Sequence, residues 1–207
     1  FSATMPPKIR TLATSLLKNP KSISLAISKP AEGLTQNAYM IHDNQKVRLV
    51  RELLKAKGKD LSHVLIFASS IKSVKEIKTT LNKAGMRASE MHSGLDQDQR
   101  EETIRDFKNK KIRILVATDI LSRGIDIKGI ELVINYEVPH DAEDYVHRIG
   151  RTARADRTGE AITFINPRQV KNFMDIEKLI EKAVPKLDLP NGFEKGPEYT
   201  IQQRNNK

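Results

Sequence analysis

Short apolar runs, each bounded by polar or turn-forming residues, are the clearest pattern along the chain. Residues 64–67, 114–117 and 132–134 are continuous runs of this kind, and residues 161–165 form a similar segment. A continuous apolar run of this length is typical of a strand buried on both faces, as in a parallel sheet. We therefore predict a strand at each of these four segments.

Helical spacing of apolar residues separates these strands. The predicted helices lie around residues 47–54 (ended by Gly58), 71–81, 97–107 and 170–180, and shorter strands are predicted at 38–41 and 87–91. Repeated strand–helix units predict an α/β fold, with a central parallel sheet covered by helices on both faces. Ligands in such folds bind beyond the carboxyl ends of the strands, so the loops that follow strands should carry function.

The two ends of the chain differ from this pattern. Residues 6–18 have helical spacing after a proline, a short strand is predicted at 23–27, and Lys29 to Gly33 is a break. Beyond Pro185, proline, glycine and polar residues predict a loose tail. We therefore divide the chain into an upstream segment (1–29), a linker (30–35), a domain (36–186) and an irregular tail (187–207).

The composition points to a polyanionic partner. A net charge of +10 and a pI near 9.7 favour nucleic acid, although a basic surface that merely aids solubility is the alternative. The absence of cysteine excludes disulfides and thiolate metal sites and fits a reducing cytosol. No apolar stretch approaches the roughly 20 residues of a membrane span, and no secretory leader opens the chain. Since no methionine stands first, we expect a piece of a longer protein.

Four arginines spaced three residues apart form the sharpest chemical signal. They are Arg148, Arg151, Arg154 and Arg157, with Asp156 the single acidic neighbour. On a helix, like charges on neighbouring turns repel one another, so this arrangement indicates a site for an anion. Guanidinium groups bind phosphate bidentately, which favours a polyphosphate. A solvated basic helix is the alternative.

The segment 117–127 follows a predicted buried strand, where the topology places a ligand. Thr118 can donate to a phosphate, Gly124 allows close backbone approach, and Asp126 can accept from a ribose hydroxyl. An ordinary strand-to-helix loop is the alternative. Asp96 is a plausible helix N-cap, and Phe67 is a plausible core residue. No histidine pair has metal-ligand spacing; His92 is expected to be structural, and no metal site is predicted.

These motifs, in this order, resemble those of DEAD-box RNA helicases of superfamily two. His147 to Arg154 is similar to their arginine-finger motif, 117–127 to their Thr-Asp…Gly-Ile-Asp motif, and Gln97-x-x-Arg100 to their Gln-x-x-Arg motif. Ser2-Ala3-Thr4 is similar to a motif near the end of their first motor domain. The chain departs at Ala153, where glycine is common, and at Ser93-Gly94, where glycine and an acidic residue are usual. The resemblance implies a RecA-like three-layer sandwich.

The resemblance also implies a role for each matching residue. Arg151 and Arg154 would be catalytic fingers that contact the terminal phosphates of ATP, with His147 linking RNA binding to hydrolysis. The other implied groups are Asp126 and Phe67 on the ATP side, Thr118, Arg123, Gly124, Gln97 and Arg100 on RNA, and Ser2, Thr4, His147 and Arg148 in coupling between domains.

Two motifs of the family are missing from the chain, the phosphate-binding loop Gly-x-x-x-x-Gly-Lys-Ser/Thr and the Asp-Glu-Ala-Asp sequence. The resemblance implies that a first motor domain carries both and binds most of ATP and Mg²⁺, so this chain alone should be inactive. We expect backbone-directed RNA binding, a monomer, a cytoplasmic location, and an uncovered apolar face on residues 6–18. A non-catalytic RNA-binding module, a DNA-directed motor and an unrelated nucleotide enzyme are the alternatives.

Overall fold

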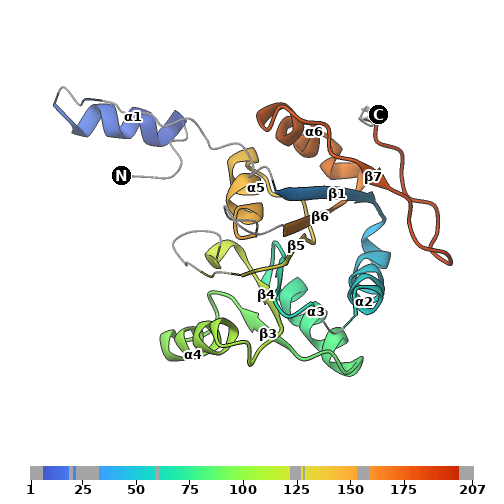
Figure 1. Cartoon of the computed structure of the whole chain (residues 1–207). Coiled ribbons are helices and arrows are strands. Elements are labelled where there is room, and N and C mark those ends of the chain that lie inside the picture. The colour runs from blue at the N-terminus through green and yellow to red at the C-terminus, as the bar shows by residue number, and fades with distance from the viewer. Residues whose placement is uncertain are drawn as a thin grey trace.

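One parallel sheet organises the computed structural model, which describes residues 7–18, 21, 33–58, 61–121, 127, 129–152 and 159–200. Within these residues, seven strands lie in the order β3-β4-β2-β5-β6-β1-β7 (Figure 1). Their bounds are β1 Leu34–Met40, β2 Val64–Phe67, β3 Ala88–Met91, β4 Ile114–Ala117, β5 Leu132–Asn135, β6 Gly159–Ile165 and β7 Lys186–Leu187. All pairings are parallel, so every strand ends at the same edge.

The central strands are short and completely buried, as their continuous apolar runs predict. In register, Val64 of β2 lies opposite Ile114 of β4 and Leu132 of β5. All residues of these three strands are buried. Because both faces of each strand contact helices, the alternation that marks a half-exposed strand is absent from their sequences.

Helices cover both faces of the sheet, which confirms the predicted α/β architecture. Their bounds are α1 Pro7–Leu16, α2 Lys46–Ala56, α3 Ile71–Lys83, α4 Gln97–Lys108, α5 Ala142–Ile149 and α6 Val170–Leu179, with short 3₁₀ turns η1 Asp43–Gln45, η2 Asp119–Leu121 and η3 Pro167–Gln169. One face packs against α2 and α3. The other face packs against α5 and α6 over β1 and β6, and against α4 over β2 and β4.

Local capping explains where two of these helices begin. The Ser70 side chain accepts a hydrogen bond from the Ser73 amide (3.1 Å) at the start of α3. Asp96 caps α4 through a reciprocal pair of hydrogen bonds with Gln99, which confirms the predicted N-cap. Strand β1 begins at Leu34, so the last two residues of the predicted linker belong to the strand.

The C-terminal tail is irregular but not loose, and the prediction of a loose tail is wrong for residues 186–200. Strand β7 pairs with β1, and the tail then forms a loop beside β7 (Figure 1). Leu189 and Phe193 pack on the α2–α3 side of the sheet, whereas Tyr199 packs on the α5–α6 side. Few apolar residues therefore suffice to hold a segment whose proline and glycine content prevents regular structure.

Glu177 of α6 ties the tail to the domain. Its carboxylate accepts hydrogen bonds from the Val184 amide (2.6 Å), the Tyr199 hydroxyl (2.6 Å) and the Lys186 ammonium (2.5 Å). Farther along, the Arg48 guanidinium lies over the Phe193 ring at 4.4 Å. These contacts join α2, α6 and the tail into one unit.

Helix α1 keeps an uncovered apolar face, as predicted. Ile9 is 47% exposed, Leu16 is 73% exposed, and Leu12 and Leu17 are also more than half exposed. Figure 1 shows α1 standing apart from the sheet. No helix among the described residues is both long and apolar enough to cross a membrane.

Substituting Gly196 by alanine should destabilise the domain. A Cβ built at this position would lie 1.9 Å from the carbonyl oxygen of Met40, which is backbone and cannot rotate away. Overpacking of this kind costs about 1–3 kcal/mol. We expect a lower urea midpoint for Gly196→Ala, with no change for Lys195→Ala, which alters an exposed neighbour. Equal midpoints for the two variants would show that the tail does not hold its position against β1.

Glu177→Gln should destabilise the domain in a pH-dependent way. Burial alone would raise the pKa of Glu177, but hydrogen bonds from Lys186, Tyr199 and the Val184 amide, together with the charge of Lys186, hold it below its usual value. A carboxyl group with a lowered folded-state pKa contributes stability above its unfolded pKa, about 4.3, and loses it as the pH falls through the folded value.

The melting temperature of Glu177→Gln should therefore lie below that of the wild type at pH 7, and the gap should narrow below about pH 4. Asp175→Asn is the matched control, because its carboxylate is 53% exposed and lies 3.5 Å from Lys178. A gap that stays constant with pH would contradict the assigned ion pair.

Candidate nucleotide and nucleic-acid interface

The carboxyl edge of β3 and β4 brings two of the predicted motifs together. Thr118 directly follows β4, and its backbone amide donates to the carbonyl oxygen of Met91 at the end of β3 (3.0 Å). This bond holds Thr118 beside the turn that leads into α4. The predicted RNA contacts Thr118, Gln97 and Arg100 therefore come from adjacent segments.

Arg100 braces this turn from the first turns of α4. Its Nε and Nη2 donate to the carbonyl oxygen of Leu95 (2.9 and 2.7 Å), and Nη2 also donates to that of Ser93 (3.2 Å). Gln97 is exposed and donates to Glu101 (2.7 Å). Gln97 thus faces solvent, while Arg100 combines a partly exposed cation with a structural role.

His92 is structural, as predicted. Its ring is buried, and Nδ1 accepts from the amide of Gly94 (3.1 Å), so the proton of the neutral ring lies on Nε2. Nε2 lies 3.7 Å from Glu90, too far for a hydrogen bond. The buried His63 is likewise a core residue, with Nε2 at 2.7 Å from the carbonyl oxygen of Phe107.

Arg148 and Arg151 do not share a helix. Helix α5 ends at Ile149, so Arg148 lies in its last turn and Arg151 lies beyond it. Thr152 then pairs with Ile130, and its hydroxyl donates to the carbonyl oxygen of Ile130 (2.6 Å). This buried side-chain bond and the bridge hold Thr152 beside Ile130, which lies just before β5.

Arg148 is buried inside its own domain. Only 2% of its side chain is exposed, and it forms a bidentate ion pair with Asp119, with Nε–Oδ1 at 2.7 Å and Nη2–Oδ2 at 2.8 Å. Nη1 donates to the carbonyl oxygen of Glu137 (3.1 Å). Arg148 is therefore not an open ligand for an anion, and its assigned role in coupling between domains stays a prediction.

Phe67 lies behind Arg148. The guanidinium lies over the Phe67 ring, 5.2 Å from its centroid, and the ring is completely buried at the end of β2. The expectation that Phe67 is a core residue is confirmed. The fully buried ring presents no surface in this structure, and its assignment to the ATP side stays a prediction.

Arg151 and His147 form the partly exposed part of the motif. Nε of Arg151 donates to the carbonyl oxygen of His147 (3.2 Å), one turn back along α5. His147 is itself partly exposed, and its Nδ1 lies 3.9 Å from Asp144. A partly exposed guanidinium offers only donors and a permanent positive charge, which fits a phosphate group. The described residues include no cluster of histidine and acidic side chains able to hold a metal ion.

Six predicted site residues lie outside the described part of the chain. They are Ser2, Thr4, Arg123, Gly124, Asp126 and Arg154. Their assigned roles remain predictions.

Sequence reasoning missed the role of Asp119. Its partner Arg148 lies 29 residues away, and neither residue type nor spacing links the two. The excess of arginines over acidic residues near residue 148 suggested that these arginines have no acidic partner. The carboxylate that pairs with Arg148 is that of Asp119, which follows β4.

A polar cavity on the same edge was also missed. Its volume is about 400 Å³, and its lining includes Asp43, Lys46, Ser73 and Glu137. The buried Lys46 ammonium lies 2.8 Å from Asp43, and Glu137 accepts from the Ser69 amide (2.9 Å). Burial raises the pKa of Glu137 despite this hydrogen bond and the nearby positive charges. The carboxylate of Asp43 thus lies beside the start of α2, and that of Glu137 lies beside the start of α3.

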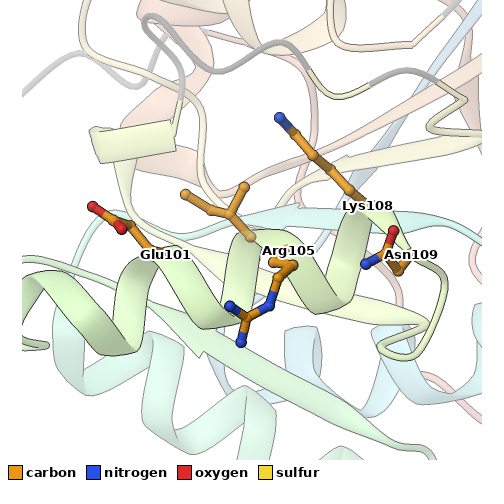
Figure 2. A pocket seen from close by; sticks show the side chains of 5 residues that line it. Glu101, Arg105, Lys108 and Asn109 are labelled. Carbon is orange, nitrogen blue, oxygen red and sulfur yellow. The ribbon is translucent and has the colours of Figure 1, made fainter.

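A second hollow, of about 260 Å³, lies along α4 (Figure 2). It is lined by Glu101, Ile104, Arg105, Lys108 and Asn109, and in Figure 2 the side chains of Arg105 and Lys108 point in different directions. None of the predicted site residues lines it. Its charges do not converge on a common point, so it adds nothing to the site.

Comparison with known proteins agrees with these features. The family model described as helicase conserved C-terminal domain matches residues 45–156. A DEAD-box ATP-dependent RNA helicase, CshA of Geobacillus kaustophilus, is 36% identical over 191 residues, which are 92% of this chain and 40% of that protein. The pre-mRNA-splicing ATP-dependent RNA helicase prp28 of Schizosaccharomyces pombe is 38% identical over 92% of this chain and 29% of its own length. The chain thus spans less than half of these relatives.

Solved structures resemble most of the chain. A DEAD box protein from Methanococcus jannaschii matches with a TM-score of 0.69 at 40% identity, over 90% of this chain and 50% of that one. Dbp5 of S. cerevisiae bound to RNA and ADP BeF3 matches with a TM-score of 0.78 at 26% identity over the same shares. The RecA-like fold is thereby confirmed, and the chain belongs to the family of helicase conserved C-terminal domains, as found in DEAD-box helicases.

Proposed function

We propose that this chain is the second motor domain of an ATP-dependent DEAD-box RNA helicase. In this role it supplies cationic groups to an ATP site shared with an upstream domain and binds the backbone of one RNA strand. The observation that carries the proposal is the different environment of two arginines in the motif. Arg148 is buried and fully engaged, whereas Arg151 is presented, partly exposed, just beyond α5.

The chemistry of phosphoryl transfer fits a presented guanidinium. Negative charge shifts among the phosphate oxygens during transfer, and a fixed cation that meets this charge lowers the barrier. Arg151 would contact the terminal phosphates, with Arg154 and Asp126 the predicted second finger and ribose ligand. Magnesium, when bound, would offset the charge of the phosphates, and we assign its ligands to the upstream domain.

RNA would lie across the ends of β3 and β4. Thr118, Gln97 and Arg100 offer hydroxyl, amide and guanidinium donors from two adjacent segments, which suits phosphate and ribose oxygens. Contacts of this type carry little sequence information and weaken as salt rises. The net charge of +10 supports the same reading.

Turnover by the full-length protein tests the proposal directly. ATP hydrolysis should be stimulated by single-stranded RNA and not by DNA of equal length at the same salt concentration, because the family resemblance is to RNA helicases. Equal stimulation by DNA would indicate a DNA-directed motor. Absence of turnover with either strand would indicate a non-catalytic binding module.

Arg151→Ala in the full-length protein should abolish most turnover and leave RNA binding nearly intact. Loss of an arginine finger lowers kcat by about 10³- to 10⁵-fold in related phosphoryl-transfer enzymes. The RNA dissociation constant should change by less than about threefold, since the assigned RNA contacts lie elsewhere. Arg105→Ala is the control, because Arg105 is an exposed arginine on α4. Parallel loss of turnover and RNA affinity in Arg151→Ala would remove Arg151 from the finger role.

A further inference from the structure

We propose that the amino edge of β3 and β4 is a second RNA-binding surface, which binds the phosphate backbone of RNA that extends beyond the motor site. This surface rests on the proposed function, because that function places another part of the same RNA at the carboxyl edge of these two strands. Four exposed cations form the surface, and we call them the amino-edge cations. They are Lys83, Arg87, Lys108 and Lys110.

The parallel sheet brings the amino-edge cations together from two separate loops. Two of them end α3 or lie in the loop from α3 to β3, and the other two end α4 or lie in the loop from α4 to β4. Strand β3 pairs with β4, with Ala88 opposite Ile114. Neighbouring strands lie about 4.8 Å apart, so the two loops meet at the same edge of the sheet.

The amino-edge cations carry positive charge that the described part of the chain does not offset. None of the four side chains forms a hydrogen bond or an ion pair with the described residues. The carboxylates on this edge have other partners. Asp106 lies 3.2 Å from the ammonium of Lys111, and Glu131 accepts from the amide and the hydroxyl of Ser62 (2.6 and 3.1 Å). An edge with unpaired cations attracts a polyanion.

Helix stability accounts for only half of these cations. A cation in the last turn of a helix is favoured by the helix dipole, which accounts for Lys83 and Lys108. Arg87 and Lys110 lie beyond the helices. Lys110 also has a φ of 60°, in the left-handed region that favours glycine at the position after a helix C-cap. A lysine held there at a conformational cost, without a partner among the described residues, favours a role in binding.

Helix α4 connects the two RNA surfaces. Its first turn carries the proposed RNA contacts Gln97 and Arg100, and its last residue is Lys108. At a rise of 1.5 Å per residue, the two ends of the helix lie about 16 Å apart. The hollow of Figure 2 lies along the same helix, and its lining acid Glu101 already accepts from Gln97 (2.7 Å). RNA bound at the start of α4 therefore presents its flank to the amino-edge cations at a high effective concentration.

RNA is the polyanion that this arrangement favours. Lysine side chains on exposed loops bind phosphates as point charges and make no demand on base sequence. RNA already held at the start of α4 meets these charges without a separate binding event. An acidic protein would have to bind through this surface alone.

A glutamine variant of the amino-edge cations in the full-length protein tests the surface. Two single-stranded RNAs are compared, the shortest that gives full affinity for the motor site and the same sequence extended at both ends. The variant should bind the extended RNA at least about fivefold more weakly at low salt, because each lost phosphate contact lowers the slope of log K against log salt by about 0.7. Affinity for the short RNA should stay within about twofold of the wild type. The substitutions are Lys83→Gln, Arg87→Gln, Lys108→Gln and Lys110→Gln.

A matched control removes the same total charge from the other end of the sheet. It replaces four exposed lysines on α6, directly after α6 and on the tail, and both RNAs should bind within about twofold of the wild type. These substitutions are Lys171→Gln, Lys178→Gln, Lys182→Gln and Lys195→Gln.

Three results would overturn the proposal. Equal weakening in the two variants would assign the effect to total charge, and equal weakening for the short and the extended RNA would assign it to the motor site or to damage of the fold. Unchanged affinity of the amino-edge variant for the extended RNA, together with lost binding of polyglutamate, would assign the surface to an acidic protein.

Two half variants cover the case in which the fourfold variant does not fold. Each changes the two cations of one loop, and each should lose about half of the expected change in salt slope. Unchanged slopes in both would exclude the surface. If the wild type binds both RNAs without RNA-stimulated ATP turnover, the motor function fails, while weaker binding of the extended RNA by the variants still supports the surface. If the wild type binds neither RNA, both proposals fail.

Discussion

The burial of one guanidinium group determines how the site is arranged. A charge withdrawn from water must be met by hydrogen-bond acceptors, and Arg148 obtains them from the end of β5 and from the turn after β4. These acceptors converge on one point because every strand of the sheet ends at the same edge. The end of α5 is held there, and with it the direction in which Arg151 projects.

The parallel sheet makes this convergence possible. Three central strands of four residues are covered on both faces, so their ends can reposition only with the whole core. Polar side chains that follow these strands are therefore carried on a rigid frame, while the segments between strand and helix remain the adjustable parts. Thr118 and Asp119 lie on such a segment, at the edge of the sheet where folds of this class bind ligands.

The two ends of the chain differ in how far their apolar side chains pack against the domain. The tail beyond β7 packs the partly buried Leu189, Phe193 and Tyr199 against the core and is bonded to Glu177, so it completes the domain. Helix α1 leaves its apolar side chains exposed, so it adds no core to this domain. An exposed apolar helix face of this kind marks a contact with another surface, which suits a segment that the family resemblance places with an upstream domain.

Local patterns in the sequence were enough to predict the strands at 64–67 and 114–117, the helices around them, and the N-cap Asp96, because each depends on residues close together in the chain. The motif spacing likewise identified the candidate residues. Only the tertiary structure decided that Arg148 forms an ion pair with Asp119, that Phe67 is inaccessible to solvent, and that the tail packs against the core. Each of these facts depends on a partner distant in sequence, and neither residue type nor periodicity specifies which distant groups a folded chain brings into contact.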